Sequence, residues 1–334
     1  MPQLNFHEFD VPTPVYEDIA ARHESFRSAL SDAQDAAAAE EAVRSWDALR
    51  REIDTWGALV HLRFNQDTTN ADYMAAREYC DQLSPKVQDL DVKLKRQLLA
   101  SEHRAALAER IGALAFDLWE VDVLAFDPAI QDDLVAESEL EAKYNELCAS
   151  AKFDFRGETC NLSEITKYLQ ESDRQLRHDA DRVRWQWCAE NGEQLDDIYD
   201  QLVGLRTKMA QKLGFDDFVG LGYKRMSRID YGQEDVERFR AGVREHIVPL
   251  GEAIHRQQAE LLGLAYDELR AWDEQIFDPA GNPKPQGDHD WMLGRAQQMF
   301  DDLGGGLDDF FRMMVDVDLL DLKNRQGKAP GGFC

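Results

Sequence analysis

Apolar residues recur three and four positions apart along most of this 334-residue chain, and this spacing constrains its fold more than any other feature. Such spacing gathers apolar side chains on one face of an α-helix, which must then pack against another element. The clearest stripe runs from Val43 to Phe64 and includes Trp46 and Trp56. We therefore predict a mainly α fold, with one long amphipathic helix here and both tryptophans in the core.

A second long helix is predicted to follow and to pair antiparallel with the first. Residues 67–70 (DTTN) offer capping side chains for its start, and its apolar stripe includes Val87 and Leu98. We expect this stripe to continue through Leu114. Pro85 lies inside the segment, where the lost amide hydrogen bond predicts a kink or a break between two helices.

The sequence changes character near residue 150. In AKFDFRGETCNL, Phe153 and Phe155 alternate with polar neighbours, and Arg156-Gly157 can turn the chain, which predicts a small β-hairpin near 152–161. We accordingly expect a helical N-terminal domain over residues 1–150 and a second domain over residues 151–334. Ser172, with a glutamine three residues later, predicts the start of the next helix.

Helical spacing returns in the second half of the chain. A stripe from Leu195 to Leu213 predicts a helix ended by Gly214, and a further helix is expected from Asp235 to about Leu262, bent at Pro249. Residues 277–290 are rich in proline and glycine and predict an extended loop. A helix should begin after this loop at Trp291.

The charge balance excludes two classes of partner. The 65 acidic and 38 basic residues give a net charge of −27, which repels nucleic acid and anionic membrane surfaces. The first residues contain no apolar signal-peptide core, and no apolar run reaches the length of a membrane span, so we expect a cytoplasmic protein. Acidic pairs such as Asp132-Asp133 and Asp301-Asp302 are interpreted as solvated helix surface.

Residues that could carry zinc chemistry are sparse. An HExxH helix supplies two histidines one turn apart with a glutamate between them. His7-Glu8 and His23-Glu24 have no second histidine at the required spacing, and we interpret both as ordinary surface pairs. Five widely spaced cysteines without a CxxC motif argue against a disulfide framework or a thiolate zinc site.

Two other motifs have structural explanations. Asp288-His289-Asp290 could bind a metal ion or orient a histidine as a base, but the spacing suits a single site poorly, and Asp290 is predicted to cap the helix that follows. GLGYKR at residues 220–225 has half of a dinucleotide fingerprint, and its glycines are expected to end a helix and allow close packing. Phosphate-loop and GxSxG motifs do not occur.

Four longer strings, taken together, resemble one family, and they occur in the family's order. They are KRMSRIDYGQEDVERFR (224–240), HIVPL (246–250), LRAWDEQIFDPAGNPKPQGD (269–288) and LLDLKNRQGKAPGGFC (319–334). The chain is similar here to the oligoendopeptidase F and Pz-peptidase branch of the M3 zinc metallopeptidases. The resemblance implies a zinc endopeptidase that cleaves short peptides in a channel between largely helical halves, with HExxH and a later glutamate holding the metal.

The family's zinc motif has no counterpart in this sequence. In relatives HExxH follows the GKAPGGFC-like segment by a few tens of residues, and this sequence stops at Cys334. We expect the N-terminal portion of such an enzyme, with residues 151–334 as the first part of its peptidase domain. Zinc is expected in the complete protein, and neither a metal site nor a catalytic residue in this chain. The sequence could end at Cys334 for three reasons: an incomplete reading frame, deliberate shortening of the protein, or a natural truncation.

The resemblance also implies one binding segment. In relatives the glycine-rich string lies beside the active-site channel, so Gly331, Gly332, Phe333 and Cys334 are candidate contacts for an extended peptide. The other interpretation is a plain turn before a structural strand starting near residue 330. Oligopeptides are the expected partners. The alternative function is a non-catalytic helical peptide-binding or scaffold protein that kept the same fold.

Overall fold

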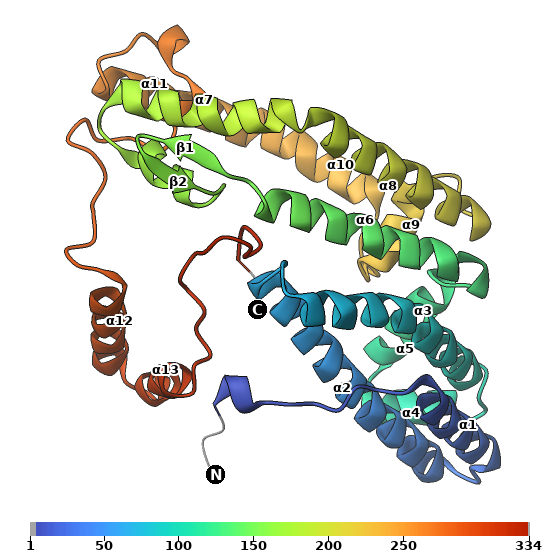
Figure 1. Cartoon of the computed structure of the whole chain (residues 1–334). Coiled ribbons are helices and arrows are strands. Elements are labelled where there is room, and N and C mark those ends of the chain that lie inside the picture. The colour runs from blue at the N-terminus through green and yellow to red at the C-terminus, as the bar shows by residue number, and fades with distance from the viewer. Residues whose placement is uncertain (1–4, 333–334) are drawn as a thin grey trace. The chain divides into compact units, whose positions relative to one another are not determined.

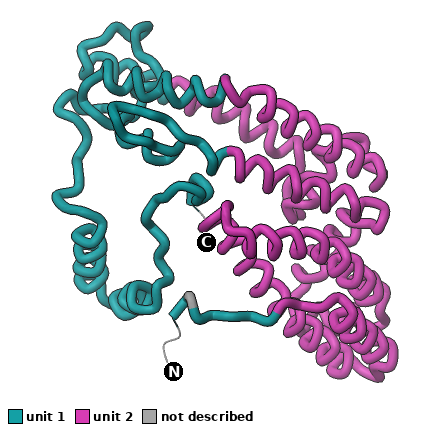
Figure 2. The backbone as a smooth tube through the Cα atoms, viewed as in Figure 1, with its two compact units in different colours: residues 1–12, 148–189, 251–332 teal, residues 13–147, 190–250, 333–334 magenta. Residues whose placement is uncertain are grey.

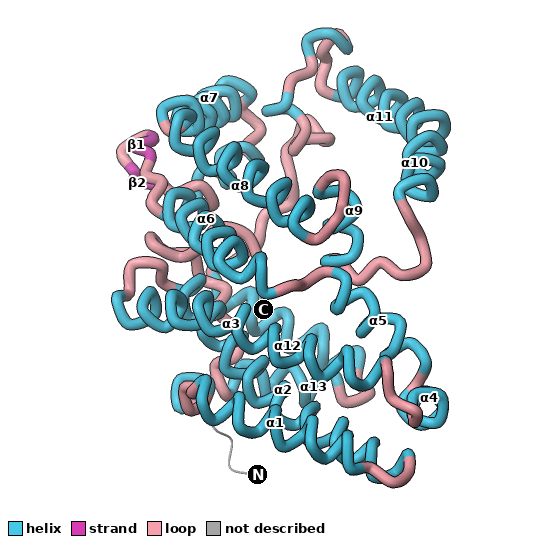
Figure 3. Tube along the Cα trace, turned by 90° about the vertical axis from the view of Figure 1, so that its right-hand side faces the viewer, coloured by secondary structure: helices cyan, strands magenta, loops and turns pink. Residues whose placement is uncertain are grey.

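A computed structural model describes residues 5–332 of the chain, apart from the His7 side chain. The described part is mainly helical and carries one two-stranded antiparallel sheet (Figures 1 and 3). The strands are β1 (Phe153–Phe155) and β2 (Glu158–Cys160). The helices are α1 (Tyr16–Asp32), α2 (Ala36–Gln66), α3 (Ala71–Leu99), α4 (Arg104–Ile111), α5 (Ala113–Leu124), α6 (Gln131–Ala149), α7 (Arg174–Glu190), α8 (Gly192–Lys212), α9 (Phe218–Arg225), α10 (Gln233–Gly242), α11 (Val248–Leu261), α12 (His289–Leu303) and α13 (Leu307–Asp316). The mainly α fold is confirmed.

The chain forms two compact units whose segments alternate along the sequence (Figure 2). Within the described residues, unit 1 contains residues 5–12, 148–189 and 251–332, and unit 2 contains residues 13–147 and 190–250. The division into domains at residue 150 stays a prediction. None of the helices in the described residues is long and apolar enough to span a bilayer.

Unit 2 is built around the predicted pair of long helices. Trp46 and Trp56 of α2 are both buried, and Trp46 packs beside Leu94 and Leu98 of α3 in one apolar cluster. Trp119 of α5 closes this cluster, with its ring centroid 5.7 Å from that of Trp46. The apolar stripe read from the sequence is therefore the inner face of α2, as its spacing requires.

The expectations for the second helix are met only in part. Pro85 does not break it, because α3 runs without interruption from Ala71 to Leu99, and the kink that was the other expectation stays a prediction. Packing against α1, α2 and α5 offsets the one hydrogen bond that the proline removes. The stripe also does not continue through Leu114, since Gly112, with φ of 101°, separates α4 from α5.

The predicted hairpin is confirmed. Phe153 pairs with Cys160, and the turn between the strands places Arg156 at φ 54° and Gly157 at φ 83°. Two consecutive residues with positive φ match the right-handed twist of a tight hairpin. The inward side chains of Phe153 and Phe155 are buried against apolar residues of α7 in unit 1.

Local capping differs from the sequence prediction at two helix starts. Asp173, and not Ser172, caps α7, because its Oδ1 accepts hydrogen bonds from the amides of Gln175 (2.9 Å) and Leu176 (3.3 Å). Asp288, and not Asp290, caps α12, because its Oδ1 accepts from the amide of Trp291 at 3.0 Å. The predicted helix start at Trp291 is therefore two residues late.

Two further predictions need correction, and a third stays in part a prediction. The glycines of GLGYKR lie inside α9 instead of ending a helix, although a side chain at Gly220 would approach the Phe215 ring to 3.0 Å, so close packing does hold. The helix expected from Asp235 to about Leu262 is present as α10 and α11, joined by a π-helical turn over Val243–Ile247, and its bend at Pro249 stays a prediction. No strand is assigned over residues 330–332, where Gly331 has φ of 96°, and the rest of that prediction falls outside the described residues.

Candidate functional site

The candidate peptide-binding segment lies at the end of the described chain. Gly331 and Gly332 are exposed, and an added Cβ at either would meet no atom within 4 Å. Their backbone amide and carbonyl groups are therefore sterically open, as pairing with an extended peptide requires. Phe333 and Cys334 lie outside the described residues. The assignment of these four residues to substrate binding stays a prediction.

A compact ion-paired loop holds the residues that lead into this segment. Arg325 donates from both terminal nitrogens to the Asp321 carboxylate, at 2.7 and 2.9 Å. Lys328 Nζ donates to the Asp321 carbonyl at 2.6 Å and lies 3.2 Å from Oδ1. The hydrogen bond from Arg325, with a further one from Lys328, holds the pKa of Asp321 below its ordinary value. Ala329 is buried beside this loop.

The same loop is tied to the β-hairpin of unit 1. Asn324 Nδ2 donates to Asn161 Oδ1 at 2.9 Å, and Asn161 Nδ2 donates to the Arg325 carbonyl at 3.4 Å. Gln326 Nε2 donates to the carbonyl of Ala149 at 3.0 Å. Side chains that follow β2 thus position a segment more than 160 residues later. The sequence strings indicated both segments but not their contact.

A buried ion cluster holds Trp272 and Asp273, which belong to the family-like string at residues 269–288. Asp273 is 0% exposed and accepts hydrogen bonds from Arg177 (2.8 Å) and Arg174 (2.9 Å). Burial alone would raise the pKa of Asp273, but the bonds from the two arginines outweigh it and lower the pKa. Gln258 Nε2 of α11 also donates to the Asp273 carbonyl at 2.9 Å. A carboxylate saturated in this way holds structure and is not available as a general base.

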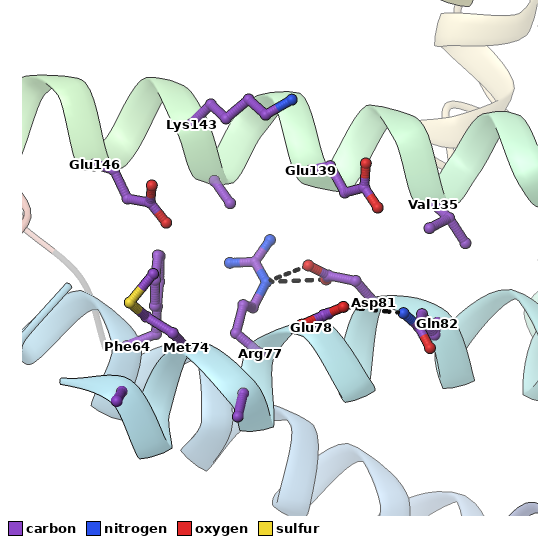
Figure 4. A pocket seen from close by; sticks show the side chains of 13 residues that line it. Phe64, Met74, Arg77, Glu78, Asp81, Gln82, Val135, Glu139, Lys143 and Glu146 are labelled. Atoms are coloured by element: carbon purple, nitrogen blue, oxygen red, sulfur yellow. Dashed lines mark hydrogen bonds and ion pairs between the residues drawn. The ribbon is translucent and has the colours of Figure 1, made fainter. Parts of the chain in front are cut away.

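A cavity of about 550 Å³ lies in unit 2 between α3 and α6 (Figure 4). Arg77 and Asp81 form a buried ion pair on its α3 side, with Nε 2.9 Å from both carboxylate oxygens. The guanidinium also lies 5.5 Å from the ring centroid of Phe64. Figure 4 shows Glu139 and Glu146 on the α6 side of the cavity. The apolar spacing and motifs of the sequence did not indicate this site, and its local signal is an arginine and an aspartate four residues apart.

One predicted acidic surface is partly buried. Asp132 is exposed, but Asp133 is buried and accepts hydrogen bonds from Lys208 (2.6 Å) and Lys212 (2.5 Å) of α8. Burial by itself would raise the pKa of Asp133, yet the two lysines outweigh it and lower the pKa. The prediction of solvated surface is therefore wrong for Asp133, which joins α6 to α8.

The histidine next to Glu24 is also not a surface residue. His23 is 1% exposed, and its burial lowers its pKa to about 4. Its Nε2 lies 3.5 Å from Oδ1 of Asp91, which accepts a 2.6 Å hydrogen bond from Trp46 Nε1. This cluster belongs to the core of unit 2. The His7 side chain lies outside the described residues.

The described residues contain no group of three or more histidine, cysteine, aspartate or glutamate side chains that could hold a metal ion. In the DHD motif, Asp288 is occupied as a helix cap, and Asp290 Oδ1 lies 3.7 Å from Lys323 Nζ. These two carboxylates therefore serve other contacts.

The fold has close structural relatives. Pz peptidase A, solved with an inhibitor, superposes with a TM-score of 0.95 and 35% sequence identity, covering 98% of this chain and 58% of its own. A Bacillus anthracis protein assigned as an oligoendopeptidase F gives a TM-score of 0.94 and 35% identity, covering 99% of this chain and 60% of its own. The chain thus spans about three fifths of the length of these relatives.

Sequence comparison agrees with the superpositions over the first helices. The Peptidase M3 N-terminal domain family matches residues 6–126. The oligoendopeptidase F from Enterococcus faecium, at 14% identity and a TM-score of 0.57, shares the fold alone. No curated protein sequence matches the chain.

Proposed function

The chain belongs to the M3 peptidase family, as its N-terminal portion, and we propose that the complete protein is a zinc-dependent oligoendopeptidase that hydrolyses peptide bonds in short peptides. The observation that carries this proposal is the agreement of nearly the whole chain with Pz peptidase A, a relative solved with an inhibitor. The four family-like strings of the sequence support the same function independently.

The described residues do not form a binding site for the zinc ion that this chemistry requires. Zinc hydrolases hold the ion with three protein ligands, and the described residues offer no such group. We propose that the zinc ligands and the general base belong to a part of the complete protein that this sequence does not contain. No catalytic step is therefore assigned to a residue of this chain.

The contribution proposed for this chain is substrate binding. Gly331 and Gly332, together with Phe333 and Cys334, would pair through their backbone with an extended oligopeptide. The Asp321–Arg325–Lys328 loop supports this role, because it fixes the chain just before the open glycines. A preorganised backbone loses less conformational entropy when it binds a peptide.

The decisive experiment begins with the coding DNA beyond codon 334. We expect an in-frame HExxH motif and a later glutamate. The product of that longer frame should hydrolyse an internally quenched oligopeptide, lose activity to a chelator and regain it with zinc. The 334-residue chain alone should show neither stoichiometric zinc nor turnover.

Other outcomes would redirect the proposal. A stop codon directly after Cys334 would favour the alternative of a non-catalytic peptide-binding or scaffold protein. Peptide turnover by the purified 334-residue chain, persisting in a chelator, would contradict the zinc mechanism outright.

A further inference from the structure

The cavity of about 550 Å³ between α3 and α6 has no role in the substrate contacts proposed above. Both helices belong to unit 2, so one compact unit supplies the whole lining. Apolar side chains contribute to both walls, including Met74 and Ala75 of α3 and Val135 and Ala142 of α6. An apolar lining with a few placed polar groups, at this volume, is the usual form of a small-molecule site.

Arg77 is the buried polar side chain that α3 presents to the cavity. It is 7% exposed, and its Nε donates to both oxygens of Asp81 at 2.9 Å. Its two terminal nitrogens have no partner among the described residues, and they are not among the partnerless atoms sealed from solvent. They therefore open onto the cavity, on the side that faces α6 in Figure 4.

The guanidinium of Arg77 is held in place before any ligand arrives. Asp81 fixes it through Nε, and it lies 5.5 Å from the ring centroid of Phe64. Asp81 also compensates its charge, so the two terminal nitrogens are available as oriented hydrogen-bond donors. Two parallel N–H donors of this kind match the two oxygens of a carboxylate.

Two carboxylates face Arg77 from the opposite wall. Figure 4 shows Glu139 and Glu146 pointing from α6 into the gap, whereas Lys143 points away from it. Seven residues separate the two glutamates, which is about two helical turns, so they share one face of α6. In the described part of the chain neither forms an ion pair with another residue. An ammonium group is therefore favoured on this side of the cavity.

The charges of the whole lining decide between classes of ligand. Four carboxylates and two cations line the cavity: Glu78, Asp81, Glu139, Glu146, Arg77 and Lys143. This excess of negative charge disfavours a purely anionic ligand. A simple cation would leave the terminal nitrogens of Arg77 without an acceptor from the ligand. A ligand that carries both a carboxylate and an ammonium group satisfies both walls.

We propose that this cavity binds a short peptide of two or three residues with both termini free. Its carboxylate pairs with the terminal nitrogens of Arg77, and its ammonium group lies against Glu139 and Glu146. The choice of a peptide rests on the proposed function, since short peptides are the products of an oligoendopeptidase. Recognition of the two opposite charges does not rest on it, because a free amino acid carries the same groups.

The test is a calorimetric titration of the 334-residue chain at pH 7 with four ligands: the dipeptide Ala-Leu, acetyl-Ala-Leu, Ala-Leu-amide and free leucine. Acetylation removes the ammonium group, and amidation removes the carboxylate. We expect Ala-Leu to bind at least about tenfold more tightly than either blocked form, because hydrogen bonds to charged groups are the strong ones. Leucine should bind more weakly than Ala-Leu, because it fills less of the cavity.

Two variants assign each end of the peptide to its wall. Arg77→Lys keeps a positive charge beside Asp81 but loses the paired donors, so it should reduce the preference for Ala-Leu over Ala-Leu-amide at least about fivefold. The double variant Glu139→Gln/Glu146→Gln should abolish the preference for Ala-Leu over acetyl-Ala-Leu. Each variant should leave the other preference unchanged.

The matched control is Asp117→Asn/Asp132→Asn, which removes two exposed carboxylates of unit 2 outside the cavity and should leave all four titrations unchanged. Arg77→Lys alters a buried ion pair and can lower stability. If it fails to fold, the blocked peptides and the Glu139→Gln/Glu146→Gln variant carry the test, because the described structure gives these glutamates no ion pair to lose.

Equal affinity for Ala-Leu and its two blocked forms, or no binding of Ala-Leu, would overturn the site. An unchanged ammonium preference in Glu139→Gln/Glu146→Gln, or an unchanged carboxylate preference in Arg77→Lys, would overturn the assignment of that wall. Leucine binding as tightly as Ala-Leu would overturn the peptide as ligand. The titration needs neither zinc nor turnover, so its failure is distinguishable from a failure of the proposed peptidase activity.

Discussion

Asp273→Asn should destabilise unit 1 by about 3–5 kcal/mol, the usual cost of removing one partner from a buried ion pair. The substitution keeps the shape of the side chain and removes its charge. In the parent chain the buried Arg177 guanidinium lies 2.8 Å from the Asp273 carboxylate. In the variant this guanidinium faces a neutral amide. The substitution also weakens the acceptor for the Arg270 amide, which donates to Oδ2 at 3.1 Å.

The two arginines contribute unequally to this cost. The Arg177 side chain is 3% exposed, so water cannot solvate its charge when the carboxylate is lost. Arg174 is 42% exposed and can be solvated, so its share is about 1 kcal/mol or less. Arg177 also donates to the carbonyls of Glu171 and Trp272, and these bonds should survive.

The destabilisation should also depend on pH. Because the pKa of Asp273 is lowered in the folded chain, its ion pairs stabilise the fold above the ordinary aspartate pKa. That stabilisation is lost as pH falls through the lowered value. The difference between the parent and Asp273→Asn should therefore be constant from pH 6 to 8 and shrink in strong acid.

Urea denaturation followed by tryptophan fluorescence measures the effect, with hydrogen exchange over residues 269–276 to locate it in unit 1. Asp302→Asn serves as the control for loss of an exposed carboxylate and should change the free energy of unfolding by less than about 0.5 kcal/mol. A loss below about 1 kcal/mol for Asp273→Asn, with unchanged exchange, would refute the idea that this cluster holds the segment.

Three further predictions concern other parts of the fold. The pKa of His23 is lowered to about 4 in the folded chain, whereas the unfolded value is near 6.5, so protonation below pH 6.5 favours the unfolded state. The free energy of unfolding of the parent chain should therefore fall by about 2 kcal/mol between pH 7.5 and pH 5. A His23→Gln variant should show a flatter dependence of unfolding free energy on pH in urea titrations. Leu98→Ala should cost about 2–5 kcal/mol because this side chain is fully buried, whereas Leu114→Ala, at an exposed position, should cost under about 0.5 kcal/mol; equal losses in thermal denaturation would contradict the core assignment. Arg325→Ala should raise hydrogen exchange in residues 319–332 while changing overall stability by about 1 kcal/mol, because it removes the bidentate bond to Asp321; unchanged exchange would show that other contacts hold the segment.

Much of the fold was predictable because its signals are local. The apolar spacing from Val43 to Phe64 predicted α2, and the side chain of Asn70 caps α3 where the sequence placed a helix start. The hairpin followed from alternation around Arg156-Gly157. Each of these depends on residues within one or two turns of one another, so a single stretch of sequence contains the whole argument.

The failed predictions share a different cause. Pro85 sits inside an unbroken helix because packing from other helices outweighs its local penalty. Asp133 and His23 looked like surface residues, since nothing near them in the sequence shows that Lys208 or Asp91 approaches. Burial of a polar side chain depends on partners brought by the fold, and local spacing does not encode those partners.

The candidate sites divide in the same way. The sequence by itself determined the helical class, the hairpin, the resemblance to M3 peptidases and the open glycines at 331 and 332. Only the tertiary structure decided that Asn161 reaches Asn324, that Arg177 donates to the Trp272 carbonyl, and that the buried Asp273 accepts from two arginines. The physical reason is that helix and turn formation depend on neighbours along the chain, whereas the free energy of a buried charge depends on every group that the fold places around it.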